Sequence, residues 1–156
     1  MRNVLLKVFI GAAVTATMIF GADNSIGTWK LNVAKTKSTS TNPLKSRTEV
    51  IEATPDGGIK VTRTDQRADA TSQSYSYAFK YDGKEYPVTG TALFDTVTCK
   101  KIDENTTSVE VKKTGGKYHQ TSRIVISKDG KTRTQTVKGT DSEGKPLTVT
   151  NVYDKQ

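Results

Sequence analysis

Gly27-Thr28-Trp29 opens the first of a long series of short segments in which apolar and polar residues alternate. A glycine, one intervening residue and a tryptophan on the first strand are typical of small up-and-down β-barrels, whose interior is filled by side chains. The triplet therefore predicts that Gly27 and Trp29 form the base of such a barrel, with the indole plugging one end.

Turn signals separate the segments that follow at short intervals. They are Pro55-Asp56-Gly57-Gly58, Asp82-Gly83, Asp103-Glu104-Asn105, Gly115-Gly116, Asp129-Gly130 and Glu143-Gly144. Asp-Gly is favoured where a tight hairpin needs positive φ angles. Hairpin after hairpin predicts an antiparallel meander.

Between the turns we expect about ten strands, rich in Thr, Val, Ser and Tyr. Their expected ranges are 27–33, 46–53, 58–65, 71–81, 84–89, 93–101, 106–113, 117–127, 131–139 and 146–154. Alternation with a period of two gives each strand one dry and one wet face. The polar segment 34–45, which contains Pro43, is expected to be an exposed loop that crosses one end of the barrel.

An antiparallel sheet of this length curls, and closure into a barrel removes its two exposed edges. The sequence therefore predicts an all-β protein with a single domain at 23–156, an antiparallel up-and-down β-barrel of eight to ten strands. A single core is what a chain of 156 residues can bury.

Residues 1–22 have the layout of a secretory signal peptide. Arg2 and Lys7 supply a basic start, and residues 8–20 are apolar or small and uncharged. This apolar stretch is shorter than the roughly 20 residues that span a bilayer. We expect cleavage near Ala22, no stable membrane insertion afterwards, and a secreted or periplasmic protein; an uncleaved anchor is the alternative.

The chain is basic, with 24 lysines and arginines against 16 acidic residues and a formal net charge of +8. The basic residues are scattered over most strands and turns rather than clustered, as a nucleic-acid groove would require. We therefore expect no nucleic-acid partner, and a charged exterior that keeps the protein soluble or attracts it weakly to an anionic envelope.

Three stretches, Gly27–Leu31, Phe79–Tyr86 and Val152–Lys155, resemble the calycin superfamily, which includes lipocalins and intracellular fatty-acid-binding proteins. The closest resemblance is to exported bacterial lipocalin-like proteins. It implies a calycin-like barrel in which Tyr153 helps to bind a ligand. The last strand departs from the fatty-acid-binding pattern, because Asn151 stands where that pattern has an arginine.

The aromatic stripe of the segment 71–81 supplies the best candidates for a ligand site. Its rings combine apolar area with hydroxyl groups that can orient a ligand. The predicted ligand-binding residues are Tyr75, Tyr77, Phe79, Ile59 and Val61, with Tyr153 added by the resemblance. The alternatives are plain core packing in a filled barrel, or aromatic side chains on the outer surface.

No catalytic constellation emerges from the reactive residues. Cys99 and His119 are the only cysteine and the only histidine, so no cluster of such metal ligands can form. A G-x-S-x-G motif is absent. Cys99 is expected to point inward as an inert thiol, and Arg123 to face solvent if Ile124 and Ile126 point inward.

Together these features predict a non-catalytic, exported and monomeric barrel that binds a small hydrophobic molecule, without a metal or a cofactor. One alternative is a structural or interaction protein of the cell envelope with a filled barrel. Another is an enzyme whose polar constellation the sequence does not reveal.

Overall fold

The computed structural model describes residues 23–156, so the expected signal peptide at 1–22 lies outside the described residues. The described part has eleven strands and one short 3-10 helix. In chain order they are β1 (Gly27–Leu31), η1 (Val33–Lys35), β2 (Lys37–Ser38), β3 (Leu44–Ala53), β4 (Ile59–Arg67), β5 (Ser72–Phe79), β6 (Asp82–Pro87), β7 (Thr96–Lys101), β8 (Thr106–Lys112), β9 (His119–Ile126), β10 (Thr132–Thr140) and β11 (Pro146–Lys155).

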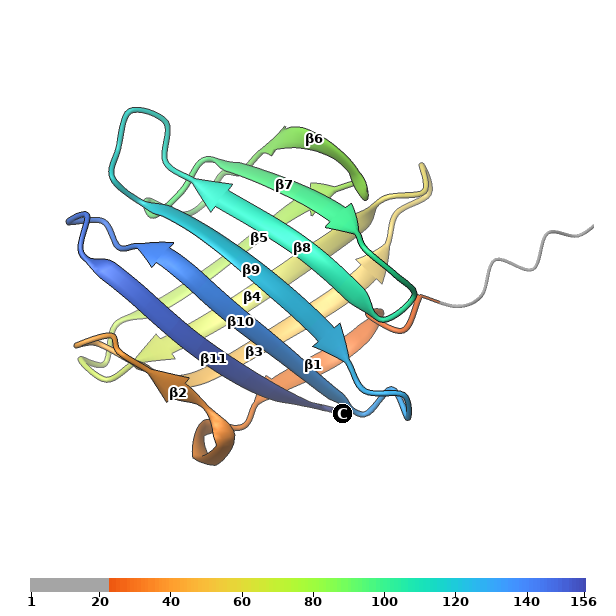
Figure 1. Cartoon of the computed structure of the whole chain (residues 1–156), viewed down its shortest axis with the longest axis horizontal. Coiled ribbons are helices and arrows are strands. Elements are labelled where there is room, and N and C mark those ends of the chain that lie inside the picture. The colour runs from red at the N-terminus through yellow and green to blue at the C-terminus, as the bar shows by residue number, and fades with distance from the viewer. Residues whose placement is uncertain (1–22) are drawn as a thin grey trace, which may run out of the picture.

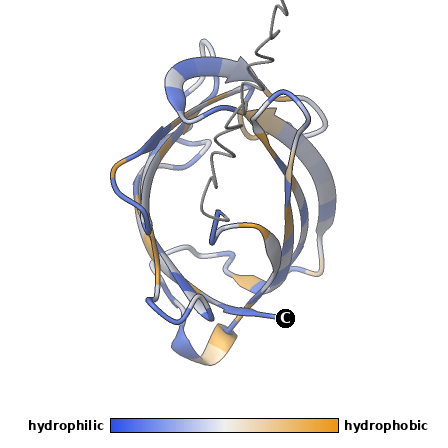
Figure 2. Ribbon diagram, turned by 90° about the vertical axis from the view of Figure 1, so that its right-hand side faces the viewer, coloured by the Kyte–Doolittle hydropathy of each residue, from blue (hydrophilic) through white to orange (hydrophobic). Residues whose placement is uncertain are grey.

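Ten of these strands form one antiparallel sheet that curls into a nearly closed barrel (Figure 1). The hydrogen-bonded order is β5-β4-β3-β1-β11-β10-β9-β8-β7-β6, and β2 adds to β11 beside this path. Seen along the barrel, the strands form a ring (Figure 2). The predicted all-β meander is confirmed, and each of the ten expected strands corresponds to a member of the ring.

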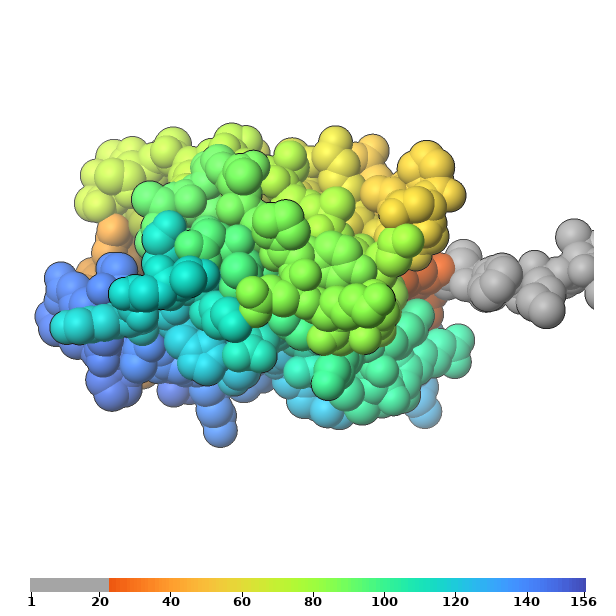
Figure 3. Space-filling view, turned by 90° about the horizontal axis from the view of Figure 1, so that it is seen from above, coloured from red at the N-terminus to blue at the C-terminus, as the bar shows by residue number. Residues whose placement is uncertain are grey.

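The seam of the barrel lies between β5 and β6, the two ends of the hydrogen-bonded order within residues 23–156. In the space-filling view from above, atoms of β6 and of the loop after it lie beside those of β5 (Figure 3). Side chains rather than a backbone ladder therefore join the ring at this point.

The segment 34–45 is largely exposed, as expected, but it is not a plain loop across the barrel end. The chain leaves β1, makes the η1 turn outside the barrel, and returns as β2, which pairs with β11 through Ser38↔Val149 and Lys37↔Thr150 (Figure 1). The side chain of Asn32 caps the turn by accepting a hydrogen bond from the Lys35 amide. The first half of the segment thus extends the line of β1 along β11 instead of crossing the barrel end.

Alternation decides which side chains enter the barrel. In β4, Ile59, Val61, Arg63 and Asp65 are buried, whereas the residues between them are exposed or half-buried. The same pattern buries Tyr75, Tyr77 and Phe79 of β5, which were predicted to share one face. The interior therefore receives apolar residues and, on the same faces, charged ones.

Trp29 is fully buried near the end of the barrel at which β1 begins. Its indole Nε1 donates a hydrogen bond to the Ser25 carbonyl oxygen at 2.7 Å, and the Lys155 ammonium lies 5.1 Å from the ring centroid. Gly27 has a φ of 134°, and a Cβ there would lie 2.7 Å from Cε of Lys155. The positive φ angle thus favours glycine at position 27, next to the flexible lysine side chain that covers the indole.

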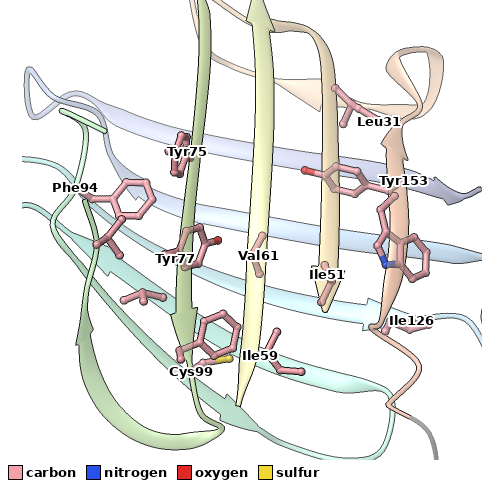
Figure 4. Packing of buried hydrophobic residues seen from close by; sticks show 14 residues of the cluster. Leu31, Ile51, Ile59, Val61, Tyr75, Tyr77, Phe94, Cys99, Ile126 and Tyr153 are labelled. Atoms are coloured by element: carbon pink, nitrogen blue, oxygen red, sulfur yellow. The ribbon is translucent and has the colours of Figure 1, made fainter. Parts of the chain in front are cut away.

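The opposite end is filled from a loop. Phe94, in the connection between β6 and β7, is buried and stacks on Tyr118 with ring centroids 5.9 Å apart. Its ring also meets Tyr75 and Tyr77 edge-on at 5.9 and 6.1 Å, and Figure 4 shows it beside both tyrosines. The expected strand 93–101 begins only at Thr96, because the chain before it forms this plug.

Candidate functional site

The interior contains a void of about 40 Å³. That is more than the ~10–15 Å³ that one water needs, but well below the ~150 Å³ of an engineered cavity that admits benzene. Four of the six predicted ligand-binding residues line it, namely Ile59, Val61, Tyr77 and Phe79. Tyr75 and Tyr153 are buried in the core without lining the void, and Gly27 and Trp29 lie at the barrel end.

The opposite wall of the void comes from β7, β8 and β9. Cys99, Val109, Ile124 and Ile126 line it there. Burial raises the pKa of the Cys99 thiol to about 12, so this side chain remains a neutral, apolar part of the wall at ordinary pH. Arg123, between two inward residues of β9, is exposed, as expected if Ile124 points inward.

A layer of charged residues borders this apolar chamber, and sequence reasoning did not find it. Glu49 of β3 is fully buried between two arginines. Its Oε1 lies 2.8 Å from Nη2 of Arg63, and its Oε2 accepts a hydrogen bond from Nη1 of Arg133. Burial by itself would raise the pKa of Glu49, but the attraction of Arg133, Arg63 and Arg47 outweighs it and holds the pKa well below its usual range.

A second buried ion pair lies further along the same strands. Arg47 donates to Asp65 twice, from Nε to Oδ1 at 2.6 Å and from Nη2 to Oδ2 at 2.5 Å. The two side chains are only 10% and 3% exposed. This two-point geometry satisfies both oxygens of the carboxylate and is the stronger kind of charged hydrogen bonding.

Tyr153 lies between these ion pairs. The Arg133 guanidinium lies 5.0 Å from its ring centroid, and Nη1 of Arg47 donates to its hydroxyl at 3.5 Å. The arginines that accompany this tyrosine therefore come from β3 and β10, while Asn151 occupies the position on β11 where the fatty-acid-binding pattern has one. The carboxylate that Arg133 holds is the protein's own Glu49.

The hydrogen bonding of this layer is incomplete. Arg63 donates from Nη1 to the Tyr75 hydroxyl at 3.1 Å, but its buried Nε has no partner in the structure. The buried Oδ1 of Asn151 and the buried Oε1 of Glu49 likewise have no hydrogen-bond partner. Buried polar groups are nearly always satisfied in native proteins, so each of these atoms marks a position at which a further group is needed.

The sequence contains a signal for this layer. Arg63 and Asp65 continue the face of Ile59 and Val61 at a spacing of two, and Arg133 precedes the buried Val137 by an even number of residues. When alternate residues on one face of a strand are first apolar and then charged, without a shift in the alternation, the charged residues are predicted to lie inside the barrel as well. These buried charged residues are missed when every charged residue is assigned to the outer face.

The remaining reactive groups lie apart from the void. His119 and Glu110 form an exposed pair on the outer surface, with Nε2 and Oε1 2.7 Å apart. Within residues 23–156, no three His, Cys, Asp or Glu side chains gather as a metal site would require. In the same part of the chain, no helix has the length and apolar character needed to cross a membrane.

A second hollow, of about 200 Å³, lies at the turn between β4 and β5. Only polar and charged side chains line it: Asp65, Arg67, Thr71, Ser72 and Gln73. Because one hairpin supplies all of them, this hollow lacks the converging apolar walls of a ligand pocket.

The charged layer predicts a specific pH dependence. The pKa of Glu49 is lower in the folded state than in the unfolded chain, so the unfolded chain binds more protons in acid. The free energy of unfolding therefore decreases as the pH is lowered. The contribution of Glu49 is fully present above its ordinary pKa of about 4.3 and is lost progressively below it. Urea unfolding midpoints between pH 7 and pH 3 test this, and Glu49→Gln should show a shallower decline. Equal declines in the two proteins would contradict it.

No protein-family model matches the sequence, and no curated protein matches it in sequence. Solved structures do match the fold. Wild-type fluorescent protein UnaG superposes with a TM-score of 0.58 at 13% identity, covering 85% of this chain and 98% of that one.

Two further structures cover 85% of this chain. The Schistosoma mansoni fatty-acid-binding protein in complex with arachidonic acid has a TM-score of 0.53, 15% identity and 96% of its own chain covered. The S-type phycobiliprotein lyase CPES from Guillardia theta has a TM-score of 0.57, 9% identity and 89% covered. At such low identities the likeness shows the fold alone, and that fold is an all-β, nearly closed antiparallel barrel of the calycin type.

Proposed function

We propose that this protein is an exported, monomeric and non-catalytic barrel that binds a small, mainly apolar ligand in its interior. The observation that carries the proposal is the void lined by apolar side chains of opposite walls, among them Val61, Phe79, Ile124 and Ile126. Converging apolar walls with a few polar groups at one side are the usual composition of a ligand site.

The size of the void sets a condition on binding. At about 40 Å³ it is too small for an organic ligand, so binding requires side chains to move aside. Phe94 is the best placed to do so, because it enters the core from a loop and contacts Tyr77, which lines the void. A loop residue can be displaced without breaking the ladder between strands.

One of the solved structures with this fold supports the direction of the proposal through its name, because it is a fatty-acid-binding protein in complex with arachidonic acid. CPES, a lyase by name, shows that the fold is not confined to proteins named for binding. Export is supported by the basic and apolar pattern of residues 1–22.

A second candidate function is favoured by the same small volume. If the side chains do not move, the barrel is a filled structural unit, and its outer surface contacts a component of the cell envelope. This candidate predicts that no small molecule competes for the interior.

A matched pair of variants separates the two candidates. Ile124→Trp puts a bulky ring into the void, whereas Val125→Trp puts the same ring on the outer face, where Val125 is 39% exposed. We expect wild type and Val125→Trp to bind a hydrophobic fluorophore such as 1-anilinonaphthalene-8-sulfonate or a neutral pyrene. Binding by Ile124→Trp should be at least tenfold weaker, since the added atoms exceed the space available.

Two further measurements complete the test. Native mass spectrometry after incubation with a lipid extract should show a bound species for wild type and Val125→Trp only. Thermal unfolding must show that Ile124→Trp still folds, given that overpacking costs about 1–3 kcal/mol. Equal fluorophore binding by both variants, or no bound species in any protein, would refute the interior ligand and favour the filled barrel.

A further inference from the structure

The buried ionised side chains of residues 23–156 do not balance in charge. Three are arginines, Arg47, Arg63 and Arg133, and two are acids, Glu49 and Asp65; each is at most 9% exposed. Since a buried charge is costly unless it is paired and hydrogen-bonded, one surplus positive charge inside a barrel calls for a counter-charge.

The surplus can be assigned to a position. Arg47 is matched by Asp65 through two hydrogen bonds, which leaves Glu49 to serve both Arg63 and Arg133. Arg133 makes a hydrogen bond to that carboxylate, whereas Nη2 of Arg63 approaches it at 2.8 Å and Nε of Arg63 has no partner at all. The buried donor that lacks an acceptor is therefore Nε of Arg63.

Both arginines that share Glu49 line the void, together with Gln135. The space of about 40 Å³ thus touches two buried guanidinium groups, and the buried Nε of one of them, Arg63, has no hydrogen-bond partner. An ion of the size of chloride or bromide fits this space without any movement of the wall, since it is little larger than a water.

Other groups near the void do not provide the missing negative charge. Burial raises the pKa of Tyr77 above its ordinary value and raises that of Cys99 to about 12, so both remain neutral at ordinary pH. Burial likewise raises the pKa of Tyr153. Asp23 acts on the Cys99 thiol, but its side chain is 21% exposed and its Oδ2 lies 3.9 Å from the Lys101 ammonium. Among residues 23–156 no aspartate or glutamate lines the void, so we expect the counter-charge from outside this part of the chain.

We propose that the void is a binding site for one singly charged anion, held by Arg63 beside Arg133. The same chemistry can come from a free inorganic anion such as chloride or from the acidic group of an organic ligand. The inference does not depend on the proposed function, because a barrel that binds no apolar molecule would still need to neutralise Arg63.

The first experiment measures thermal unfolding of delipidated protein at constant ionic strength, with sodium chloride or bromide exchanged for sodium gluconate, whose anion is too large for the void. We expect the halides to raise the unfolding midpoint by about 2–6 °C in a saturable manner. Arg63→Met should lose this response, since Glu49 and Asp65 then balance the two remaining arginines. Arg123→Met, which removes an exposed arginine of β9, should keep it.

A direct readout keeps the proposal testable if Arg63→Met does not fold. Crystals grown in sodium bromide should show an anomalous difference peak within hydrogen-bonding distance of Nε of Arg63 in the wild-type protein. Diffraction without that peak, together with equal responses to halide and gluconate, would overturn the proposal.

The source of the anionic group is decided by comparing protein as purified with protein extracted with organic solvent and refolded. A halide response in both assigns the site to a free anion. A response only after extraction, with an organic acid released and identified by mass spectrometry, assigns it to the acidic group of a ligand. Failure of the Ile124→Trp test leaves these results unaffected, so the two proposals can fail separately.

Discussion

Glu49→Gln is expected to lower the free energy of unfolding by about 3–5 kcal/mol, which is the usual cost of removing one partner from a buried ion pair. The substitution keeps the shape of the side chain and deletes only its charge. Arg63 and Arg133 then lose the carboxylate that lies between them, and the surplus of buried positive charge rises from one to two. Urea unfolding followed by the fluorescence of Trp29, the only tryptophan, measures the effect.

Glu52→Gln is the matched control, because Glu52 lies on the same strand but is exposed. Its effect should stay within about 0.5 kcal/mol. A loss below about 1 kcal/mol in Glu49→Gln would mean that water reaches the charged layer and that Glu49 is not an internal counter-charge. The surplus assigned to Arg63 would then lose its physical basis.

Trp29→Ala is expected to cost about 3–5 kcal/mol, the range for removing a large aromatic side chain from a core. The indole is fully buried, and its ring supports the Lys155 side chain that covers this end of the barrel. The alanine variant also leaves the Ser25 carbonyl oxygen without its donor. Because the variant lacks tryptophan, far-ultraviolet circular dichroism must follow its unfolding.

Trp29→Phe provides the comparison for this substitution. It retains most of the apolar area but removes the Nε1–H group and part of the bicyclic ring, so its loss of stability should be clearly smaller than that of alanine. A cost under about 1 kcal/mol for Trp29→Ala would show that the end of the barrel does not rest on the indole. The pairing of Gly27 and Trp29 as the base of the barrel would then lose its support.

The sequence predicted the ring of strands because its alternation is strong where a strand is buried on one side. The stripe Tyr75, Tyr77 and Phe79 is interrupted only by small exposed residues, and Asp-Gly turns mark where hairpins close. Such local patterns are set by the pleat of the strand and need no knowledge of the partner strand.

The charged layer was missed for a different physical reason. A strand pattern states which residues share a face, but the charge of Arg63 or Glu49 argues against burial until its partner is known. Those partners lie on strands far apart in sequence, with Arg133 separated from Glu49 by 84 positions. Pairing at that distance depends on the order of strands in the barrel, which alternation does not encode.

The plug and the short strand β2 escaped prediction because both depend on contacts rather than on periodicity. Phe94 stands in an irregular segment, and contacts with rings distant in sequence, such as those of Tyr75 and Tyr118, make its position buried. Neither Lys37 nor Ser38 has an apolar side chain that would predict a strand, yet their backbone pairs with β11. The size of the void also depends on how side chains pack, so no residue pattern in the sequence could predict it.

The seam between β5 and β6 affects whether molecules of this protein aggregate at high concentration. Strand borders with free amide and carbonyl groups are templates for intermolecular pairing, and natural proteins blunt them with charge, proline and bulges. β6 has all three, since Lys84 and Pro87 are exposed and the register shifts between Asp82 and Glu85. These residues work against fibre growth at the one place where the ring offers an unfinished border.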